Sequence, residues 1–314
     1  MESKEYFYVI NYNSASDKEL CDLEMKYIFN FVPEKKRYIV SNIDTNPSRS
    51  PFIKEKISII FSGNSLESLV KQVVDTKLSL DDFKVIYLKS GDEDVDYKER
   101  LRSVSEIGYV ITGEPNIHEP KVIVGISKIK DRWILGKYEK NDFKWHIHDR
   151  KPYTYSNSLG LKLAKSLVNV AVGNDFNLKV VDPCCGVGTV IIEALDIGIN
   201  IKGYEINSQI ADNAKKNLKF FGFENVVEEK DMHTIKENFD VAIIDMPYGI
   251  FTPTTDEKQN ELIRSVARFA KKLVIVTIKN MDKELKAAGF KIVDKCKVNK
   301  NKFIRYITVC EIGD

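Results

Sequence analysis

The stretch Val180-Val181-Asp182-Pro183-Cys184-Cys185-Gly186-Val187-Gly188-Thr189 decides the fold of this chain. A short apolar run ends in an aspartate, turns through two glycines and leads into a helical pattern of apolar residues. A strand, a glycine loop and a helix in this order typically open a parallel sheet that is covered by helices on both faces. Because open parallel sheets bind ligands outside the carboxyl ends of their strands, the sequence predicts a ligand seat at this loop.

The rest of the chain after residue 158 repeats this alternation of strands and helices. Helical stripes separate the apolar runs, and two final runs joined by Asn299-Lys300-Asn301 are typical of a β-hairpin. The strands are expected at residues 180–182, 200–205, 226–228, 241–245, 273–278, 290–298 and 303–312. We therefore predict an α/β fold with a mostly parallel, seven-stranded sheet that ends in an antiparallel hairpin.

The N-terminal part has a different order of elements, with strands that follow one another between a few helices. Strands are predicted at residues 5–12, 37–43, 56–61, 83–88, 121–127 and 132–138. The helix signals are a capping box at Ser16-x-x-Glu19, Asn64 followed by Glu67, and a run from Asp96 to Ile107 that Gly108 should stop. We predict an α+β domain at residues 1–148 and the parallel-sheet domain at residues 149–314.

The composition excludes several classes of protein. The chain has 314 residues, 43% hydrophobic and 30% charged, a formal net charge of +2, and no apolar run near the length of a membrane span. Its five cysteines form no C-x-x-C pair, which argues against both a disulfide framework and a zinc site. The charged, polar start lacks the features of a secretory signal, so we expect a cytoplasmic protein without a membrane segment.

The glycine loop indicates which cofactor the seat would accept. Gly186 and Gly188 let the backbone approach a ligand closely, although a lone G-x-G is also common in tight turns. The third position of the dinucleotide fingerprint is Ile191, neither glycine nor alanine, which disfavours a pyrophosphate and with it a nicotinamide-dependent oxidoreductase. S-adenosylmethionine has no pyrophosphate and remains compatible with the loop.

Two acidic residues follow the next two strands. Glu205 ends the second strand, where its carboxylate can accept hydrogen bonds from both ribose hydroxyls or interact with the dipole of the helix that follows. Asp231 comes just after the third strand, where it would bind an adenine amino group with Met232 packed on the ring, or serve as a plain turn residue. The sequence leaves both roles for Asp231 open.

The second informative stretch, Ile243-Ile244-Asp245-Met246-Pro247-Tyr248-Gly249, ends another strand in polar and aromatic groups. An exocyclic amine on a base is a poor nucleophile, because its lone pair is delocalised into the ring. Asp245 and the Met246 carbonyl would accept its two N–H hydrogens, Pro247 would fix the backbone and Tyr248 would stack on the base. The pattern favours amine methylation of guanine or adenine over a simple strand and turn.

With these motifs the chain resembles class I S-adenosylmethionine-dependent methyltransferases of the THUMP-containing RNA methylase family, close to the tRNA guanine-N2 methyltransferases that modify guanosine 10. The stretches Arg150–Tyr153 and Leu163–Asn169 are similar to the start of that family's catalytic domain. Residues 83–85, 107–108 and 120–124 resemble a THUMP domain more faintly. The resemblance implies a Rossmann-like catalytic domain preceded by a THUMP-like RNA-binding domain.

The resemblance also implies roles for particular residues. The implied catalytic residues are Asp245, Met246, Pro247 and Tyr248. The implied cofactor-binding residues are Asp182, Pro183, Cys185, Gly186, Gly188, Thr189, Glu205, Ile206, Asp231, Met232 and Asp245. The implied cofactor is S-adenosylmethionine, and no metal is expected.

The chain departs from the family pattern at several positions. Met246 stands where many relatives have a second proline, but only its backbone carbonyl is required. Cys184 replaces an aromatic or bulky residue and Val187 a small polar one, which affects the shape of the cofactor seat. The segment from Ile250 to Asp256 contains no arginine that would bind a phosphate.

The expected activity is methyl transfer to N2 of a guanosine in tRNA, at guanosine 10 or a nearby position, after the nucleotide has been flipped out of its stack. The same motif chemistry would also permit adenine-N6 methylation of ribosomal RNA or DNA. Less favoured are a nicotinamide-dependent oxidoreductase, a catalytically silent RNA-binding module, and a pyrimidine carbon-5 methylase that would use Cys184 or Cys185. The sequence leaves the oligomeric state and the need for an accessory protein open.

Three basic clusters qualify as RNA contacts or as solvated faces. They lie at Lys35–Arg37, at Lys144–Lys151 and at Lys295–Lys302. In the second cluster His146 and His148 would serve either as a metal pair or as part of a basic linker that faces RNA, and the linker is favoured because no third ligand is near in sequence.

Overall fold

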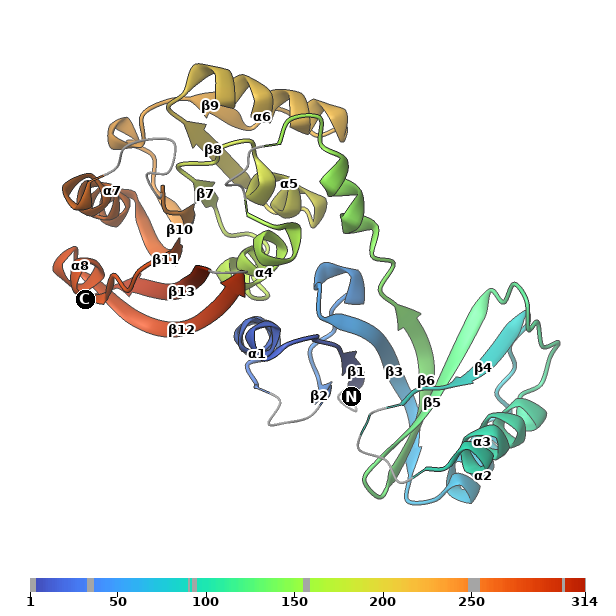
Figure 1. Ribbon diagram of the computed structural model, residues 1–314. Coiled ribbons are helices and arrows are strands. Elements are labelled where there is room, and N and C mark those ends of the chain that lie inside the picture. The colour runs from blue at the N-terminus through green and yellow to red at the C-terminus, as the bar shows by residue number, and fades with distance from the viewer. Residues whose placement is uncertain are drawn as a thin grey trace. The chain divides into compact units, whose positions relative to one another are not determined.

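The computed structural model describes residues 4–32, 37–89, 91, 95–154, 159–247, 255–300 and 303–313 (Figure 1). The chain forms two compact units. The N-terminal unit comprises Met1–Asn11 and Pro33–Asp142, and the C-terminal unit comprises Tyr12–Val32 and Phe143–Asp314. Within the described ranges, no helix combines the length and the apolar character that a membrane span requires.

The N-terminal unit is an α+β structure built on one six-stranded sheet with the order β2-β1-β3-β6-β5-β4. Its strands are β1 (Tyr6–Ile10), β2 (Tyr38–Ser41), β3 (Ile53–Gly63), β4 (Phe83–Tyr87), β5 (Val122–Ile129) and β6 (Arg132–Lys140). A short 3₁₀ turn η1 (Pro47–Arg49) and the helices α2 (Leu66–Asp75) and α3 (Tyr97–Val110) complete it. All neighbouring strands are antiparallel except β4 and β5. This agrees with the α+β arrangement expected for the N-terminal part.

Helix ends in this unit differ from the predicted ones by a few residues. Ser65, and not Asn64, caps α2, because its Oγ accepts a hydrogen bond from the Ser68 N–H at 3.1 Å. Helix α3 passes through Gly108 and ends at Val110. A glycine inside a helix costs only about 1 kcal/mol, and the buried Ile107 packs that helix into the core, so packing overrides the stop signal.

Helix α1 (Ala15–Phe29) belongs to the C-terminal unit, so the division of the chain differs from a single boundary near residue 148. The helix packs on α4 (Leu161–Val172) and β12 (Phe290–Lys300). Its Glu24 is fully buried and accepts hydrogen bonds from Ser166 Oγ and Asn169 Nδ2, both at 2.7 Å. A buried carboxylate needs such partners, which makes the packing of α1 on α4 specific.

The start of α1 also differs from the expected capping box at Ser16-x-x-Glu19. Ser14 is the N-cap, and its Oγ accepts a hydrogen bond from the Asp17 N–H at 3.0 Å. The Ser16 hydroxyl instead accepts a hydrogen bond from the Asn299 N–H at 2.6 Å, and the Glu19 carboxylate accepts one from the Lys297 N–H at 2.9 Å. Both supposed capping residues therefore bind strand β12, a contact that no local pattern reveals.

The C-terminal unit contains the predicted seven-stranded sheet, with the order β12-β13-β11-β10-β7-β8-β9. Strands β7 to β11 run parallel, and β13 runs antiparallel to both β11 and β12. The unit also contains the 3₁₀ turns η2 (Lys144–Arg150) and η3 (Met232–Thr234), the strands β7 (Val180–Asp182), β8 (Ile201–Glu205), β9 (Val227–Glu229), β10 (Phe239–Asp245), β11 (Ala270–Thr277) and β13 (Phe303–Ile312), and the helices α5 (Thr189–Asp196), α6 (Ser208–Phe220), α7 (Asp256–Phe269) and α8 (Asp282–Ala287). This is a Rossmann-like architecture, and the predicted mostly parallel, seven-stranded sheet with a final antiparallel hairpin is confirmed (Figure 1).

Helices cover both faces of this sheet, as the apolar strands require. On one face Ala242 and Ile244 of β10 pack in a cluster with Ile263 and Val266 of α7. On the other face α4 packs on β10 and β11. The carboxyl ends of β7, β8 and β10 lie at one edge, where the strand order reverses between β7 and β10, and such an edge is where ligands bind.

Candidate active site

The loop after β7 has the backbone shape that its glycines permit. Gly186 and Gly188 have φ angles of 54° and 84°, in the left-handed region that favours glycine. The loop is tied to the sheet by a hydrogen bond from the Cys185 N–H to the Tyr204 carbonyl at 2.9 Å. A Cβ atom on Gly186 would meet no described atom within 4 Å, so a ligand can approach the backbone there.

Glu205 shapes this loop from the end of β8. Its carboxylate accepts hydrogen bonds from the Gly186 N–H at 3.0 Å and from the Asn207 N–H at 2.9 Å. The second bond satisfies a backbone donor just before α6, as expected for a carboxylate at a helix start. A carboxylate offers about four lone-pair sites, so capacity remains for the two hydroxyls of a ribose. The two roles considered for Glu205 are therefore compatible.

Three further predicted residues follow the ends of β8 and β9. Ile206 is a large apolar side chain with an exposed fraction of 67%, directly after the strand end, where a flat ring would cover it. Asp231 caps the turn η3, because its carboxylate accepts a hydrogen bond from the His233 N–H at 2.9 Å. The turn role of Asp231 is thus present, while Met232 is buried beside it.

Thr189 begins α5 directly after the glycine loop, and its hydroxyl is a further candidate for ligand binding. The side chain is buried, and its Oγ1 has no hydrogen-bond partner within the ranges that the structure describes. A buried hydroxyl usually has a partner, so this atom suits a polar ligand group at the start of the helix.

The acidic residues of the predicted site lie close enough to influence one another. Asp182 is buried, and burial together with the negative charges of Asp245 and Glu205 raises its pKa to about 8, although the Cys184 N–H donates to it at 3.2 Å. Carboxylates from the ends of β7, β8 and β10 therefore meet at one edge, as the sequence predicted. A cationic ligand would relieve their mutual repulsion.

The two cysteines of the loop are poorly suited to nucleophilic catalysis. Burial raises the pKa of the Cys184 thiol far above its usual range, and the charges of Asp182, Glu205, Asp231 and Asp245 add to this. Burial and two of these carboxylates also raise the pKa of Cys185. Because the thiolate is the reactive form, this environment disfavours pyrimidine carbon-5 methylation.

The residues predicted to bind the methyl-accepting amine, Asp245 to Tyr248, begin at the last residue of β10, and we call them the acceptor motif. Asp245 is partly exposed, whereas the Met246 side chain is buried in the core. The Met246 N–H donates to the Val276 carbonyl of β11 at 3.0 Å, and Gln259 Nε2 of α7 donates to the Pro247 carbonyl at 3.0 Å. The predicted stacking residue Tyr248, with Gly249 and the segment up to residue 254, lies outside the described residues.

Four supporting hydrogen bonds, in three places, escaped the sequence analysis. Asn217 of α6 is buried, and its Nδ2 donates to the Val187 carbonyl of the glycine loop and to the Tyr153 carbonyl, both at 2.9 Å. The second is the bond from Gln259, and the third joins His233 Nδ1 to Ser265 Oγ at 2.6 Å. Asn217 is a polar residue beside Leu218 in an apolar helix stripe, which is a weak signal, and the second and third contacts have none.

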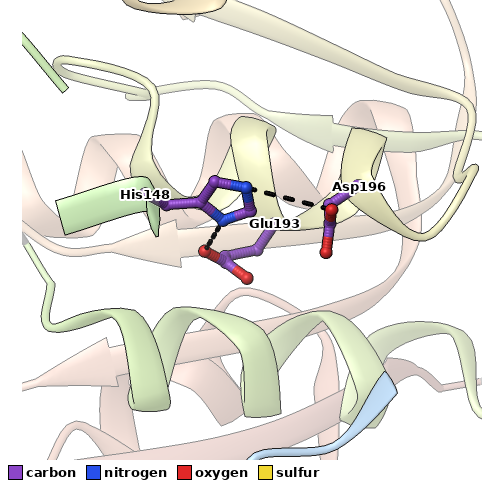
Figure 2. Close-up of side chains that lie close together, drawn as sticks. All are labelled: His148, Glu193 and Asp196. Atoms are coloured by element: carbon purple, nitrogen blue, oxygen red, sulfur yellow. Dashed lines mark hydrogen bonds and ion pairs between the residues drawn. The ribbon is translucent and has the colours of Figure 1, made fainter. Parts of the chain in front are cut away.

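Part of the predicted basic linker is buried in an ionic cluster (Figure 2). His148 of η2 has its Nδ1 at 2.7 Å from Glu193 Oε1 and its Nε2 at 3.9 Å from Asp196 Oδ1. His148, Glu193 and Asp196 thus form a group with the donor types of a metal site. The Lys165 ammonium, however, lies 3.0 Å from Asp196 Oδ2 and 3.4 Å from Glu193 Oε2. A cation from the chain already balances these carboxylates.

The burial of the linker residues restricts which of them can contact RNA. Lys151 is buried like His148, and burial lowers its pKa. Lys144, His146 and Arg150 remain exposed. The predicted RNA-facing role therefore stays a prediction for these three residues only, and the cluster at Lys35 and Lys36 lies outside the described residues.

The sequence comparisons agree with this geometry. Residues 148–301 match the family described as RMKL-like, methyltransferase domain. The matched residues make up just under half of the chain. The family resemblance expected from the motifs is confirmed for this part of the chain, and the THUMP-like character of the N-terminal unit stays a prediction.

The chain is also similar to named methyltransferases. The chain is 29% identical over 179 residues to the tRNA (guanine(10)-N2)-dimethyltransferase of Methanothermobacter thermautotrophicus, covering 54% of this chain and 53% of that protein. It is 27% identical over 277 residues to the protein of the same name from Methanocaldococcus jannaschii, covering 73% of this chain and 78% of that protein. The chain therefore spans about half the length of the first of these relatives. Among solved structures, TrmN from Thermus thermophilus matches 98% of this chain and 100% of its own with 13% identity and a TM-score of 0.48.

Proposed function

We propose that this protein transfers a methyl group from S-adenosylmethionine to the exocyclic N2 of a guanosine in tRNA. The observation that carries the proposal is the position of Asp245 and the Met246 backbone at the end of β10, one strand from the glycine loop of a methyltransferase domain. The names of the relatives supply the base and the RNA.

The residues at the ends of β7 and β8 fit the cofactor. Glu205 keeps lone pairs for two ribose hydroxyls, and Ile206 offers an apolar surface for the adenine. Asp231, just after the neighbouring strand β9, would accept a hydrogen bond from the adenine amino group. The open backbone at Gly186 suits the polar methionine end, as does the Thr189 hydroxyl, which has no partner among the described residues. The negative charges of Asp245 and Glu205, which raise the pKa of Asp182, suit the positive charge of the cofactor. S-adenosylmethionine, when bound, supplies an electrophilic methyl group on a sulfonium.

The residues at the end of β10 would activate the acceptor. The Asp245 carboxylate and the Met246 carbonyl accept the two N–H hydrogens of the amine, which turns its lone pair out of conjugation and toward the methyl group. As the nitrogen–carbon bond forms, the sulfur–methyl bond would break and leave its electron pair on sulfur as a neutral thioether. The amine would lose one hydrogen as a proton to Asp245, which releases it to solvent. The proposed steps use a carboxylate and a carbonyl, and they require neither a metal ion nor a thiolate.

The N-terminal unit and the exposed linker residues Lys144, His146 and Arg150 would hold the body of the tRNA. Contacts with phosphates release counterions, so binding should weaken steeply as the salt concentration rises. Titration of labelled tRNA at several salt concentrations measures the slope, and a flat response would contradict a phosphate-dominated contact. The THUMP-like identity of this unit and a cytoplasmic location are further parts of the proposal.

The decisive experiment is transfer of a radiolabelled methyl group to a total tRNA pool, followed by nucleoside identification and mapping. We expect label in N2-methylguanosine or N2,N2-dimethylguanosine at position 10 or close to it. Label in N6-methyladenosine, or transfer to ribosomal RNA or DNA in place of tRNA, would favour adenine methylation. Calorimetric titration with S-adenosylmethionine and with a nicotinamide cofactor separates the methyltransferase from an oxidoreductase.

A further inference from the structure

Helix α7 reaches the acceptor motif through one buried side chain. Gln259 lies in the first turns of α7 with an exposed fraction of 7%, and its Nε2 donates to the Pro247 carbonyl at 3.0 Å. Its Oε1 is also buried and has no partner in the part of the chain that the structure describes. An unpaired buried oxygen costs about 1–3 kcal/mol, so a contribution to stability alone does not account for this residue.

The orientation of the Gln259 amide follows from its partner. A carbonyl only accepts hydrogen bonds, so the NH₂ group of the amide must face Pro247 and the amide oxygen must point away. The reverse orientation would place two oxygens in contact and lose the bond. The unpaired Oε1 is therefore a consequence of holding the Pro247 carbonyl.

Two anchors enclose the peptide that carries the proposed acceptor carbonyl. On one side the Met246 N–H is bound to the Val276 carbonyl of β11 at 3.0 Å. On the other side the Pro247 ring fixes φ, and the bond from Gln259 restrains ψ through the Pro247 carbonyl. The Met246 carbonyl lies between these two points, so its direction is set from both ends.

We propose that Gln259 is a positioning residue that aims the Met246 carbonyl at the amine of the target base. The inference rests on the proposed function, because the Met246 carbonyl has this task only if an amine is methylated. Gln259 itself touches neither the base nor the cofactor in this scheme. It acts through Pro247.

The first test is Gln259→Met, which keeps the length of the side chain and removes the donor. We expect the kcat for tRNA methylation to fall about 5- to 100-fold, the range between losing one hydrogen bond and misplacing a reacting group by about 1 Å. Cofactor affinity measured by calorimetry should stay within about twofold, because the cofactor seat is built from other strands. The melting temperature should change little, since the variant also removes the unpaired Oε1.

A second variant, Gln259→Glu, gives a signature that a purely structural role would not show. A protonated carboxyl donates to the Pro247 carbonyl, whereas a carboxylate repels it. We expect the kcat of this variant relative to the wild type to rise as the pH falls toward the usual carboxyl pKa, and that of Gln259→Met relative to the wild type to stay level. Level ratios for both variants would count against the proposal.

A matched control is Gln72→Met in the N-terminal unit. Gln72 Nε2 also donates to a backbone carbonyl, that of Ser62, at 3.0 Å. The control removes the same kind of bond from a helix that is not part of the acceptor motif. Measured at saturating tRNA, its kcat should therefore equal that of the wild type, because a contribution of this unit to tRNA binding would change KM alone.

The outcomes separate this inference from the proposed function. If the wild type methylates tRNA and Gln259→Met keeps its kcat within twofold, the inference is overturned and the function stands. If Gln259→Met lowered the cofactor affinity and the melting temperature together with kcat, Gln259 would have a general structural role, and the inference would also be overturned. If the wild type transfers no methyl group to RNA, the proposed function fails, and hydrogen exchange at the Met246 amide decides the anchoring: faster exchange in Gln259→Met supports it, and equal exchange overturns it.

Discussion

The proposed cofactor side of the candidate site, at the ends of β7 and β8, and its proposed acceptor side, at the end of β10, are held in place in different ways. At the ends of β7 and β8, carboxylates accept hydrogen bonds from backbone N–H groups of their own or the adjacent loop. The Glu205 carboxylate binds the Gly186 N–H of the loop after β7 and the Asn207 N–H two residues on, and the Asp182 carboxylate binds the Cys184 N–H. At the end of β10, the motif is held from other elements, by the Val276 carbonyl of β11 and by Gln259 of α7. Substitutions on the two sides should therefore change different quantities.

The comparison also separates binding from chemistry. The cofactor side presents capped, hydrogen-bonded groups that are in place without a ligand, which favours affinity. The acceptor side presents one partly exposed carboxylate and one carbonyl whose direction depends on distant anchors, which matters for the transition state. Variants on the cofactor side should alter the cofactor dissociation constant, and variants on the acceptor side should alter turnover.

The largest expected effect is that of Asp245→Ala. Without the carboxylate the amine keeps its conjugated lone pair and no base takes the proton, so turnover should fall on the order of 10²- to 10⁴-fold. Cofactor affinity should be roughly kept, which calorimetry checks. Asp212→Ala, which removes an exposed carboxylate from α6, is the control. Normal turnover in Asp245→Ala would exclude the assigned role and remove the distinction between the two sides.

The corresponding change on the cofactor side is Glu205→Gln. The amide loses the charge and one acceptor, and it turns an N–H toward a backbone donor of the loop. Hydrogen bonds to a charged group are worth about 1.5–3 kcal/mol, so cofactor affinity should fall about 10- to 100-fold while kcat at saturation changes little. Glu228→Gln on β9, which is more than half exposed, should leave both quantities unchanged. A large loss of kcat in Glu205→Gln would contradict the expectation that substitutions on the cofactor side change affinity and not turnover.

The burial of Asp182, together with its repulsion from Asp245 on the acceptor side, should be visible in the pH dependence of stability. Asp182 has its pKa raised to about 8 in the folded protein, so the folded state holds a proton that the unfolded state releases above about pH 4. The stabilisation that Asp182 contributes is therefore fully present below about pH 4 and is lost as the pH rises through about 8. Relative to Asp182→Asn, the wild type should lose on the order of 3 kcal/mol of unfolding free energy between pH 5 and 8.

Denaturant unfolding at several pH values measures this difference, and Asp245→Asn sharpens it. Removing the Asp245 charge should lower the pKa of Asp182 and reduce the slope, because that charge is one of the causes of the shift. A slope identical in the wild type and Asp182→Asn would show that the residue is charged throughout, and the two sides would then not be coupled through it.

Much of the site could be predicted because its groups follow strand ends. Asp182, Glu205 and Asp245 each end a strand of a parallel sheet, and adjacent strands bring such residues to one edge whatever the intervening helices contain. The glycine loop was equally readable, because left-handed backbone at Gly186 and Gly188 requires those residue types. The topology of the sheet brings these strand ends to one edge, so residues found from local patterns lie together in the fold.

The parts that escaped prediction depend on contacts between distant segments. Glu24 makes α1 a part of the C-terminal unit through Ser166 and Asn169, and its charge in a helix gives no sign of burial. Gln259 resembles any polar residue of an exposed helix start until Pro247 is placed next to it. His148 lies among basic neighbours in the sequence, and only the fold reveals the Glu193 carboxylate beside it.

The smallest effect that we predict compares two contacts of the same helix. Ser265 Oγ of α7 is hydrogen-bonded to His233 Nδ1 of the turn η3 at 2.6 Å, and Arg268 donates to the His233 carbonyl at 3.1 Å. Ser265→Ala removes one of these two supports for the turn that carries Asp231, so cofactor affinity should fall only about two- to fivefold, close to the worth of one neutral hydrogen bond, with kcat kept. Calorimetry and steady-state kinetics on Ser265→Ala and Gln259→Met should give opposite patterns, an affinity loss in one and a turnover loss in the other. If both variants lost turnover, the two contacts of α7 would not act separately on the two sides. The distinction between the cofactor side and the acceptor side would then not hold for the residues of this helix.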